Sequence, residues 1–157
     1  MPHIHEKYDF VVVVYIVHDG KVLLVNHPRY DKWIPVGGHI ELDEDPEMAL
    51  YREIAEETGL ETEILSSKPS VQSPGNKFLL TPHGISVHEA NPPHKHIGLT
   101  YFARARNDKF ILSKEHSSMK WFTSGELEEG IYKLSPAVTY YAQTALETDK
   151  TWQKRRA

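Results

Sequence analysis

The sequence predicts one α/β domain over residues 1–157, built as an α/β/α or α+β sandwich around a mixed sheet. Segments typical of strands lie on both sides of a strongly marked central helix, and a second helix is expected near the carboxyl end. A chain of this length buries roughly two-thirds of its unfolded surface, so it needs no cross-link to fold. It contains no cysteine, which excludes disulfides, thiolate metal sites and a cysteine nucleophile.

The first elements read as a hairpin followed by a short strand. Residues 8–18 are rich in Val, Tyr and Ile, which is typical of a buried strand. Asp19-Gly20 is a strong turn signal, and residues 21–26 supply the returning strand. After a polar loop, a further short strand is expected to end at Glu41. The pattern therefore places strands directly before the central helix.

The central helix has clear ends. Asp45 is the expected N-cap, Pro46 occupies the first helical position, and Gly59 stops the helix, which therefore covers residues 46–58. Residues 67–93 are rich in Pro and Gly and predict long loops around one or two short strands. The remaining expected elements are strands over 61–66, 96–106 and 119–123, a short helix over 125–127 capped by Ser124, a last helix over 136–148, and disorder after about Thr148.

The net charge of −4 conceals a concentrated acidic segment. Residues 41–61 hold nine acids against one base, Arg52, so this segment carries −8 and the remainder carries +4. Such a segment suggests bound cations with an anionic substrate near them. No basic stripe or basic helix is present, which argues against binding to a nucleic-acid polymer. The longest apolar run is too short to span a membrane and the amino terminus lacks a signal-peptide layout, so a cytoplasmic protein is expected.

Three glutamates of the central helix share one side. On a helical wheel, Glu53, Glu56 and Glu57 fall within an arc of about 100°. The other side carries Met48, Leu50, Tyr51, Ile54, Ala55 and Thr58. The sequence therefore predicts a helix that packs its apolar side into a core and presents three carboxylates from the other. Clustered hard oxygen ligands suit Mg²⁺ or Mn²⁺, and an ordinary solvated acidic face is the alternative.

The segment 38–60 reads G-x5-E-x7-R-E-U-x-E-E-x-G-U, where U is a bulky aliphatic residue. The fixed positions are Gly38, Glu44, Arg52, Glu53, Glu56, Glu57 and Gly59, with Ile54 and Leu60 at the aliphatic positions. This is the complete signature of the Nudix (MutT-like) hydrolases. The chain also resembles that family in the hairpin before the signature, in Trp33-x-x-x-Gly-Gly, and in Trp121-Phe122 with its following Glu-Leu. The resemblance implies a Nudix-type α/β/α sandwich around a mixed β-sheet.

The resemblance also implies an activity: Mg²⁺-dependent hydrolysis of the pyrophosphate linkage in a nucleoside diphosphate derivative, with Mn²⁺ as a substitute. Glu53, Glu56 and Glu57 match the family's metal-binding glutamates, one of which also activates water. Arg52 matches the arginine that orients these carboxylates, and Glu44 matches the acid that pairs with it. The catalytic and metal-binding residues are therefore expected in and around this helix.

Two positions outside the helix extend this expected site. Gly37 matches a position whose backbone carbonyl can ligate metal. The family often supplies another glutamate from the loop before the closing Trp, and Glu115 is the candidate for this catalytic or metal-binding role. An ordinary loop charge is the alternative interpretation of Glu115.

Four residues are candidates for substrate contacts. His94 and His96 are two positions apart at a strand start, so both rings share a face that could contact phosphate or base. Trp33 and Tyr101 are candidates for stacking on a base, with a core position as the alternative for each. A zinc site that includes the two histidines lacks a third ligand at a specifying spacing.

The favoured substrate is a (deoxy)nucleoside triphosphate, giving the monophosphate plus pyrophosphate. ADP-ribose or a nucleotide sugar is the alternative, because Pro74 lies near a position where ADP-ribose-cleaving relatives often carry proline. A non-catalytic Nudix-fold nucleotide sensor and a structural calcium-binding domain are the competing classes. The intact glutamates favour catalysis, and the lack of an alternating Asp/Asn loop counts against calcium. The expected partner is a nucleotide substrate, and binding to a nucleic-acid polymer or a membrane is not expected. The oligomeric state stays open, and a homodimer is one possibility because homodimers are common in the family.

Overall fold

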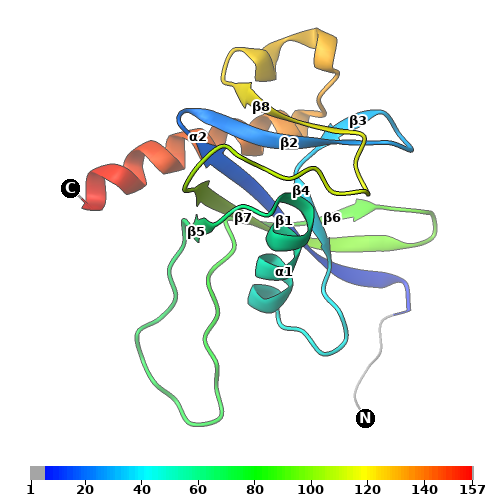
Figure 1. Cartoon of the computed structure of the whole chain (residues 1–157). Helices are drawn as coiled ribbons and strands as arrows, with labels where there is room; N and C mark the ends of the chain where they lie inside the picture. Colours follow the sequence, from blue (N-terminus) through cyan, green and yellow to red (C-terminus); the bar gives the residue numbers. More distant parts are fainter. Residues whose placement is uncertain (1–5, 157) are drawn as a thin grey trace.

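The computed structural model describes residues 6–156 and contains one mixed sheet with a long helix on each side (Figure 1). The strands are β1 (Tyr8–His18), β2 (Lys21–His27), β3 (Lys32–Ile34), β4 (Val36–His39), β5 (Thr62–Ile64), β6 (Gly84–Glu89), β7 (Lys95–Ala105) and β8 (Ser118–Thr123). The helices are α1 (Pro46–Thr58) and α2 (Pro136–Arg156), with 3-10 turns η1 (Glu126–Glu128) and η2 (Gly130–Tyr132). The predicted α/β sandwich is confirmed.

Strand β1 lies at the centre of the sheet. The order is β3-β2-β1-β7-β5, with β4 beside β1, β6 beside β7 and β8 beside β2. Strands β1 and β7 are parallel, whereas the other pairs within residues 6–156 are antiparallel. Along one edge, β1 pairs with β4 through its first half and with β2 through its end. This arrangement places β4, which leads into α1, beside the middle of the sheet.

The apolar residues of β1 fill two cores. Val12 and Val14 belong to the first core, which includes Leu50 of α1. Tyr15 and Val17 belong to the second core, which includes residues of α2. Successive side chains of a strand point to opposite faces, so the two helices cover opposite faces of the sheet. A strand buried on both faces has a nearly continuous apolar sequence, which is the pattern predicted for this segment.

Local signals account for the ends of α1. A side-chain oxygen of Asp45 accepts hydrogen bonds from the backbone N–H groups of Glu47 and Met48, at 2.9 and 3.0 Å. Pro46 begins the helix, and Gly59 ends it in the left-handed conformation with φ of 65°. The helix boundaries predicted from the sequence are therefore confirmed.

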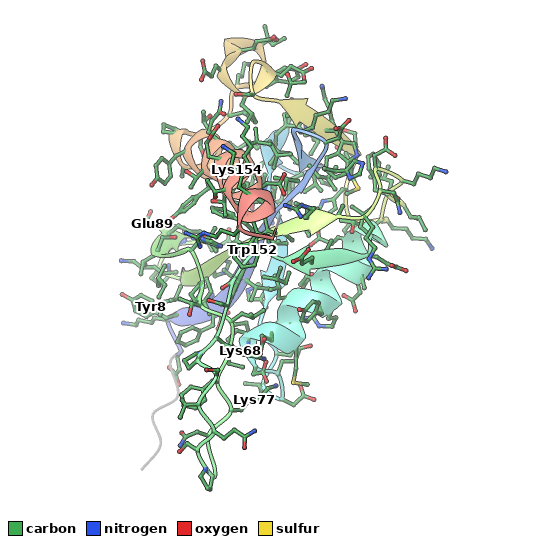
Figure 2. All side chains as sticks on the ribbon, turned by 90° about the vertical axis from the view of Figure 1, so that its left-hand side faces the viewer. Tyr8, Lys68, Lys77, Glu89, Trp152 and Lys154 are labelled. Carbon is green, nitrogen blue, oxygen red and sulfur yellow. The ribbon has the colours of Figure 1, made fainter. Side chains whose placement is uncertain are left out.

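Helix α2 continues past its predicted end at Thr148, and the disorder expected beyond that residue is wrong. Tertiary contacts hold the extra turns: Arg104 Nε donates to Asp149 at 2.5 Å, and Trp152 Nε1 donates to Glu63 at 3.1 Å. Trp152 also packs against the second core, and Figure 2 shows it on this helix. Within the described part of the chain, no helix is long and apolar enough to cross a membrane.

The predicted cap at Ser124 is also wrong. The short helix is the 3-10 turn η1, whose N-cap is Gly125 without a side-chain cap. Ser124 Oγ instead donates to the side-chain oxygen of Gln143 on α2, at 2.8 Å. This tertiary partner competes successfully with the local capping bond because a single turn offers little stabilisation in return.

The long connection between β5 and β6 is tied to the start of α1. Lys77 Nζ lies 2.5 Å from a carboxylate oxygen of Asp45, and Lys68 Nζ lies 3.4 Å from one of Glu47. Figure 1 shows this connection extending away from the sheet, and Figure 2 labels both lysines. The acidic beginning of α1 is thereby matched by two bases from a distant segment.

Replacing Phe122 with Ala should test the second core. Phe122 is fully buried, and its ring packs edge-on against Trp33 and Tyr132 at centroid distances of 5.1 and 4.8 Å. We expect the free energy of unfolding, measured by urea titration, to fall by about 3–5 kcal/mol. Ile131→Ala, at a side chain that is 74 % exposed, should change it by about 0.5 kcal/mol or less. Equal losses in the two variants would contradict this account of the core.

Candidate active site

The guanidinium of Arg52 organises the acidic end of the signature. Its Nε and Nη2 donate to the two oxygens of Glu44 at 2.6 and 2.9 Å. Its Nη1 donates to Glu53 at 2.7 Å and to Glu56 at 3.2 Å, and Nη2 also donates to the backbone carbonyl of His39 at 2.9 Å. These five bonds use all five N–H donors of the side chain. Arg52 therefore connects α1 to β4 and to the loop between them.

Two of the three helix glutamates are buried, so the predicted division of the helix into a side packed in the core and a side that presents all three carboxylates holds only in part. Glu53 is 9 % and Glu57 is 4 % exposed, while the side chain of Glu56 is exposed. Met48 and Tyr51, predicted for the buried side, are about half exposed, at 51 % and 49 %. A helical wheel gives the relative directions of side chains, but the docking of the helix decides which direction meets the sheet.

Glu57 is the most enclosed of these carboxyl groups. One of its oxygens accepts the backbone N–H of Gly37 at 3.3 Å, and the other lies 2.6 Å from His116 Nε2. Burial raises the pKa of Glu57 to about 8, against the lowering effect of the Gly37 N–H. Glu53 raises it further by its charge and by a hydrogen bond, and the charge of Glu115 adds to this. The bare site therefore favours a proton on this carboxyl group.

The two glycines of β4 make room for this close approach. A Cβ on Gly38 would overlap the carboxylate of Glu53, and a Cβ on Gly37 would overlap the backbone carbonyl of Val12 on β1. Any larger residue would therefore displace either the glutamate or the strand. Both glycines thus serve the packing of α1 against the sheet, in addition to any role of the Gly37 carbonyl.

His116 is a site residue that the sequence analysis missed. It follows Glu115 in the loop before β8. The sequence analysis chose Glu115 in this loop because the family often has a glutamate there. The side chain of His116 is 8 % exposed, and burial lowers its pKa. Its Nε2 lies within hydrogen-bond distance of a Glu57 oxygen, at 2.6 Å. Its Nδ1 is buried without a hydrogen-bond partner among the described residues.

Glu115 itself is exposed, yet it lies near enough to influence the pKa of Glu57. Its backbone N–H is bonded to Ser113 Oγ at 3.3 Å. The structure therefore brings this loop to the helix glutamates, with His116 making the direct contact.

The four residues predicted to contact substrate lie in three places, because only His94 and His96 are neighbours. The ring of Trp33 is half-buried in the second core, against Phe122. Tyr101 is 1 % exposed within the first core, so the stacking role suggested for it does not fit its position. His94 pairs with Asp9 at 2.8 Å, and its ring is 5.4 Å from that of His96. Burial and neighbouring histidines lower the pKa of His96.

The donor set at α1 fits a hard divalent cation. Carboxylate oxygens are the ligands that Mg²⁺ prefers in proteins. Arg52 holds Glu53 and Glu56 through one shared nitrogen, and Glu57 lies beside Glu53. Burial raises the pKa of Glu57, and a bound cation would favour its ionised form.

The sequence profile of the NUDIX domain matches residues 7–141. The chain belongs to the NUDIX family. It is similar to two curated relatives over a shorter segment: 39 % identity over 54 residues with a MutT-like protein of Streptomyces ambofaciens, and 40 % over 58 residues with the CTP pyrophosphohydrolase of Escherichia coli K12. Each match covers 34 % of this chain. The matched segment is 35 % of the Streptomyces protein and 43 % of the Escherichia coli protein, so the chain matches less than half of each relative's length.

Solved NUDIX structures share the fold over nearly the whole chain. A NUDIX hydrolase from Clostridium perfringens has a TM-score of 0.79 and 31 % identity, covering 88 % of this chain and 96 % of that one. A MutT NUDIX hydrolase from Burkholderia pseudomallei has a TM-score of 0.61 and 24 % identity, covering 91 % and 98 %. A UDP-X diphosphatase has a TM-score of 0.57 and 17 % identity, covering 99 % and 67 %. The last two likenesses concern the fold alone.

From the raised pKa of Glu57 we predict how the stability of the metal-free NUDIX domain depends on pH. On unfolding, the carboxyl returns to its ordinary pKa, so the folded state binds more protons between about pH 5 and pH 8 and its stability falls as pH rises. Glu57→Gln cannot lose a proton there. In chelator at pH 8, its free energy of unfolding should exceed that of the wild type by about 1–3 kcal/mol.

The gain from Glu57→Gln should shrink towards pH 5, as measured by urea titration across the range. Glu61→Gln is the matched control, because the Glu61 side chain is 74 % exposed just beyond α1. Parallel pH profiles for wild type and Glu57→Gln would show that the carboxyl group is not kept protonated by the fold.

Gly38→Ala should weaken binding of a divalent cation, because its methyl group would displace the Glu53 carboxylate. We expect the affinity for Mn²⁺, measured by electron paramagnetic resonance, to fall at least about tenfold. Gly125→Ala is the control, since a Cβ there meets no atom within 4 Å. An unchanged Mn²⁺ affinity in Gly38→Ala would exclude Glu53 from the cation site.

Proposed function

We propose that this protein is a Mg²⁺-dependent pyrophosphohydrolase that converts a (deoxy)nucleoside triphosphate to the monophosphate and pyrophosphate. The observation that carries the proposal is the complete signature folded into one constellation, in which Arg52 holds Glu44, Glu53 and Glu56. Family membership supports cleavage of a pyrophosphate linkage. Mn²⁺ is the expected substitute, because it shares the preference for oxygen ligands.

In this proposal, Arg52 is a positioning residue. All five of its N–H donors are used by carboxylates and by the His39 carbonyl, so none is left for a phosphate. Its function is to hold the carboxylates of Glu53 and Glu56 at one place despite their repulsion. Mg²⁺ bound by Glu53, Glu56, Glu57 and the Gly37 carbonyl would neutralise the phosphates and lower the pKa of a water molecule.

The chemical step is attack of water on a phosphorus atom of the substrate. The water oxygen forms a bond to phosphorus while the bond from that phosphorus to the bridging oxygen breaks, and the leaving group departs with the bridging oxygen. The proton of the water passes to the coupled Glu53–Glu57 carboxyl pair, which acts as the general base. His116 holds Glu57 from the other side and limits its movement during the transfer.

The nucleoside triphosphate class is supported by the CTP pyrophosphohydrolase of Escherichia coli, which is 40 % identical over 58 residues. CTP and dCTP are therefore the first substrates to test. ADP-ribose and nucleotide sugars are the next class, because they contain the same pyrophosphate linkage. Glu115, on the loop that supplies His116, is proposed to assist at the cation site through its nearby charge.

The proposal is tested by incubating the protein with Mg²⁺ and a panel of nucleoside triphosphates, ADP-ribose, dinucleoside polyphosphates and nucleotide sugars. We expect chromatography to show a nucleoside monophosphate and pyrophosphate from a triphosphate. Glu57→Gln should lower the turnover rate by about 100-fold or more, because a positioned general base contributes that much. Glu61→Gln, at an exposed acid that pairs with Arg106, should keep the wild-type rate.

Other results of the same panel would replace the proposal. Turnover of ADP-ribose or a nucleotide sugar alone would move the substrate to that class. Binding of a nucleotide without turnover, equal in wild type and Glu57→Gln, would indicate a nucleotide sensor instead of an enzyme.

A further inference from the structure

Four histidines and one aspartate gather on the sheet away from the α1 carboxylates. They are Asp9 on β1, His39 on β4, His88 on β6, His94 just before β7, and His96 on β7. The ring of His96 lies at the centre, with centroids 4.9, 5.2 and 5.4 Å from those of His39, His88 and His94. Imidazole and carboxylate together form the usual ligand set of Zn²⁺ and similar ions.

The strand register brings these side chains together. In the parallel pair, Asp9 of β1 lies opposite His96 of β7, and in the antiparallel pair His88 of β6 lies opposite His96. Directly opposite residues point to the same face, so the three form one row across the sheet. Alternation along β1 puts Asp9 on the face of Tyr15, which packs towards α2, and Val12 on the face of α1. The row is thus on the face opposite to α1.

The distances suit one small ion. His94 Nε2 lies 2.8 Å from an oxygen of Asp9, and one ligand atom from each of Asp9, His94 and His96 lies within 4.8 Å of the other two. Ligand atoms around a tetrahedral zinc ion are about 3.3 Å apart, so small side-chain rotations would close the set. His39 Nε2 lies 3.7 Å from the same Asp9 oxygen, where it can orient the carboxylate.

We propose that Asp9, His94 and His96 form a second metal site, selective for Zn²⁺-class transition metals and separate from the carboxylate site on α1. Two imidazoles and one carboxylate suit such an ion, whereas Mg²⁺ prefers oxygen ligands alone. Next to this site, His94 also lines a surface hollow of about 360 Å³ together with Tyr8 and Glu89. Figure 2 labels these last two residues at this end of the sheet.

The competing interpretation is a surface network in which Asp9 only pairs with protonated histidines. That network would bind protons but would show no stoichiometric binding of a transition metal. The two interpretations are separated by a metal titration, which does not depend on the hydrolase activity or on its substrate.

The experiment is a titration of the full 157-residue chain, free of any purification tag, with Co²⁺ in excess Mg²⁺. We expect one equivalent of Co²⁺ to give the visible d–d absorption of a four-coordinate ion and to be displaced by one equivalent of Zn²⁺. Zn²⁺ should also raise the melting temperature of the wild type, because it binds the folded state. Asp9→Asn and His94→Ala should each lower the Co²⁺ affinity at least about 100-fold.

Two controls locate the ion. His3 and His5 lie outside the described residues and repeat the His-x-His spacing, so the double variant His3→Ala/His5→Ala should keep the Co²⁺ affinity. Glu57→Gln should also keep it, since Glu57 belongs to the α1 site. The Asp9 side chain is 48 % exposed, so Asp9→Asn should fold normally. Unchanged Co²⁺ binding in both Asp9→Asn and His94→Ala, or a loss confined to the His3/His5 variant, would overturn the proposal.

Discussion

The geometry of the α1 site depends on one guanidinium group. Arg52 donates to both oxygens of one carboxylate, to two further carboxylates, and to a backbone carbonyl of β4. Its bonds hold the pKa of Glu44 below the ordinary value and its own pKa above it, so the network stays ionised. A lysine could not substitute, because an ammonium group offers three donors from a single point. Like charges on one helix turn are thereby kept together before any cation binds.

Burial of Glu53 and Glu57 imposes the second constraint. Removing a carboxylate from water is costly, and burial accordingly raises the pKa of Glu57, whereas Glu53 is paired with Arg52. Two features make this burial possible. The glycines of β4 leave space where the helix approaches, and the Gly37 N–H and His116 lie within hydrogen-bond distance of the Glu57 carboxyl group. Both carboxyl groups are thereby held in place in the metal-free protein.

One sheet keeps two groups of polar residues apart. Because side chains alternate along a strand, Val12 faces α1 while Asp9 lies on the opposite face, although both belong to β1. The carboxylates of α1 offer oxygen ligands alone, whereas the cluster around His96 offers imidazole nitrogen as well. Ligand type and position in the fold therefore separate hard-cation chemistry from transition-metal chemistry within a small protein.

The sequence by itself determined the features that arise from local interactions. The cap at Asp45, the stop at Gly59 and the hairpin turn at Asp19 each depend on neighbouring residues, and the signature lies within one segment. Only the tertiary structure decided which side of α1 meets the sheet, that α2 continues to its last turn, and that His116 reaches Glu57 across 59 positions. These outcomes depend on the docking of elements far apart in the chain, and neither periodicity nor spacing within one segment carries that information.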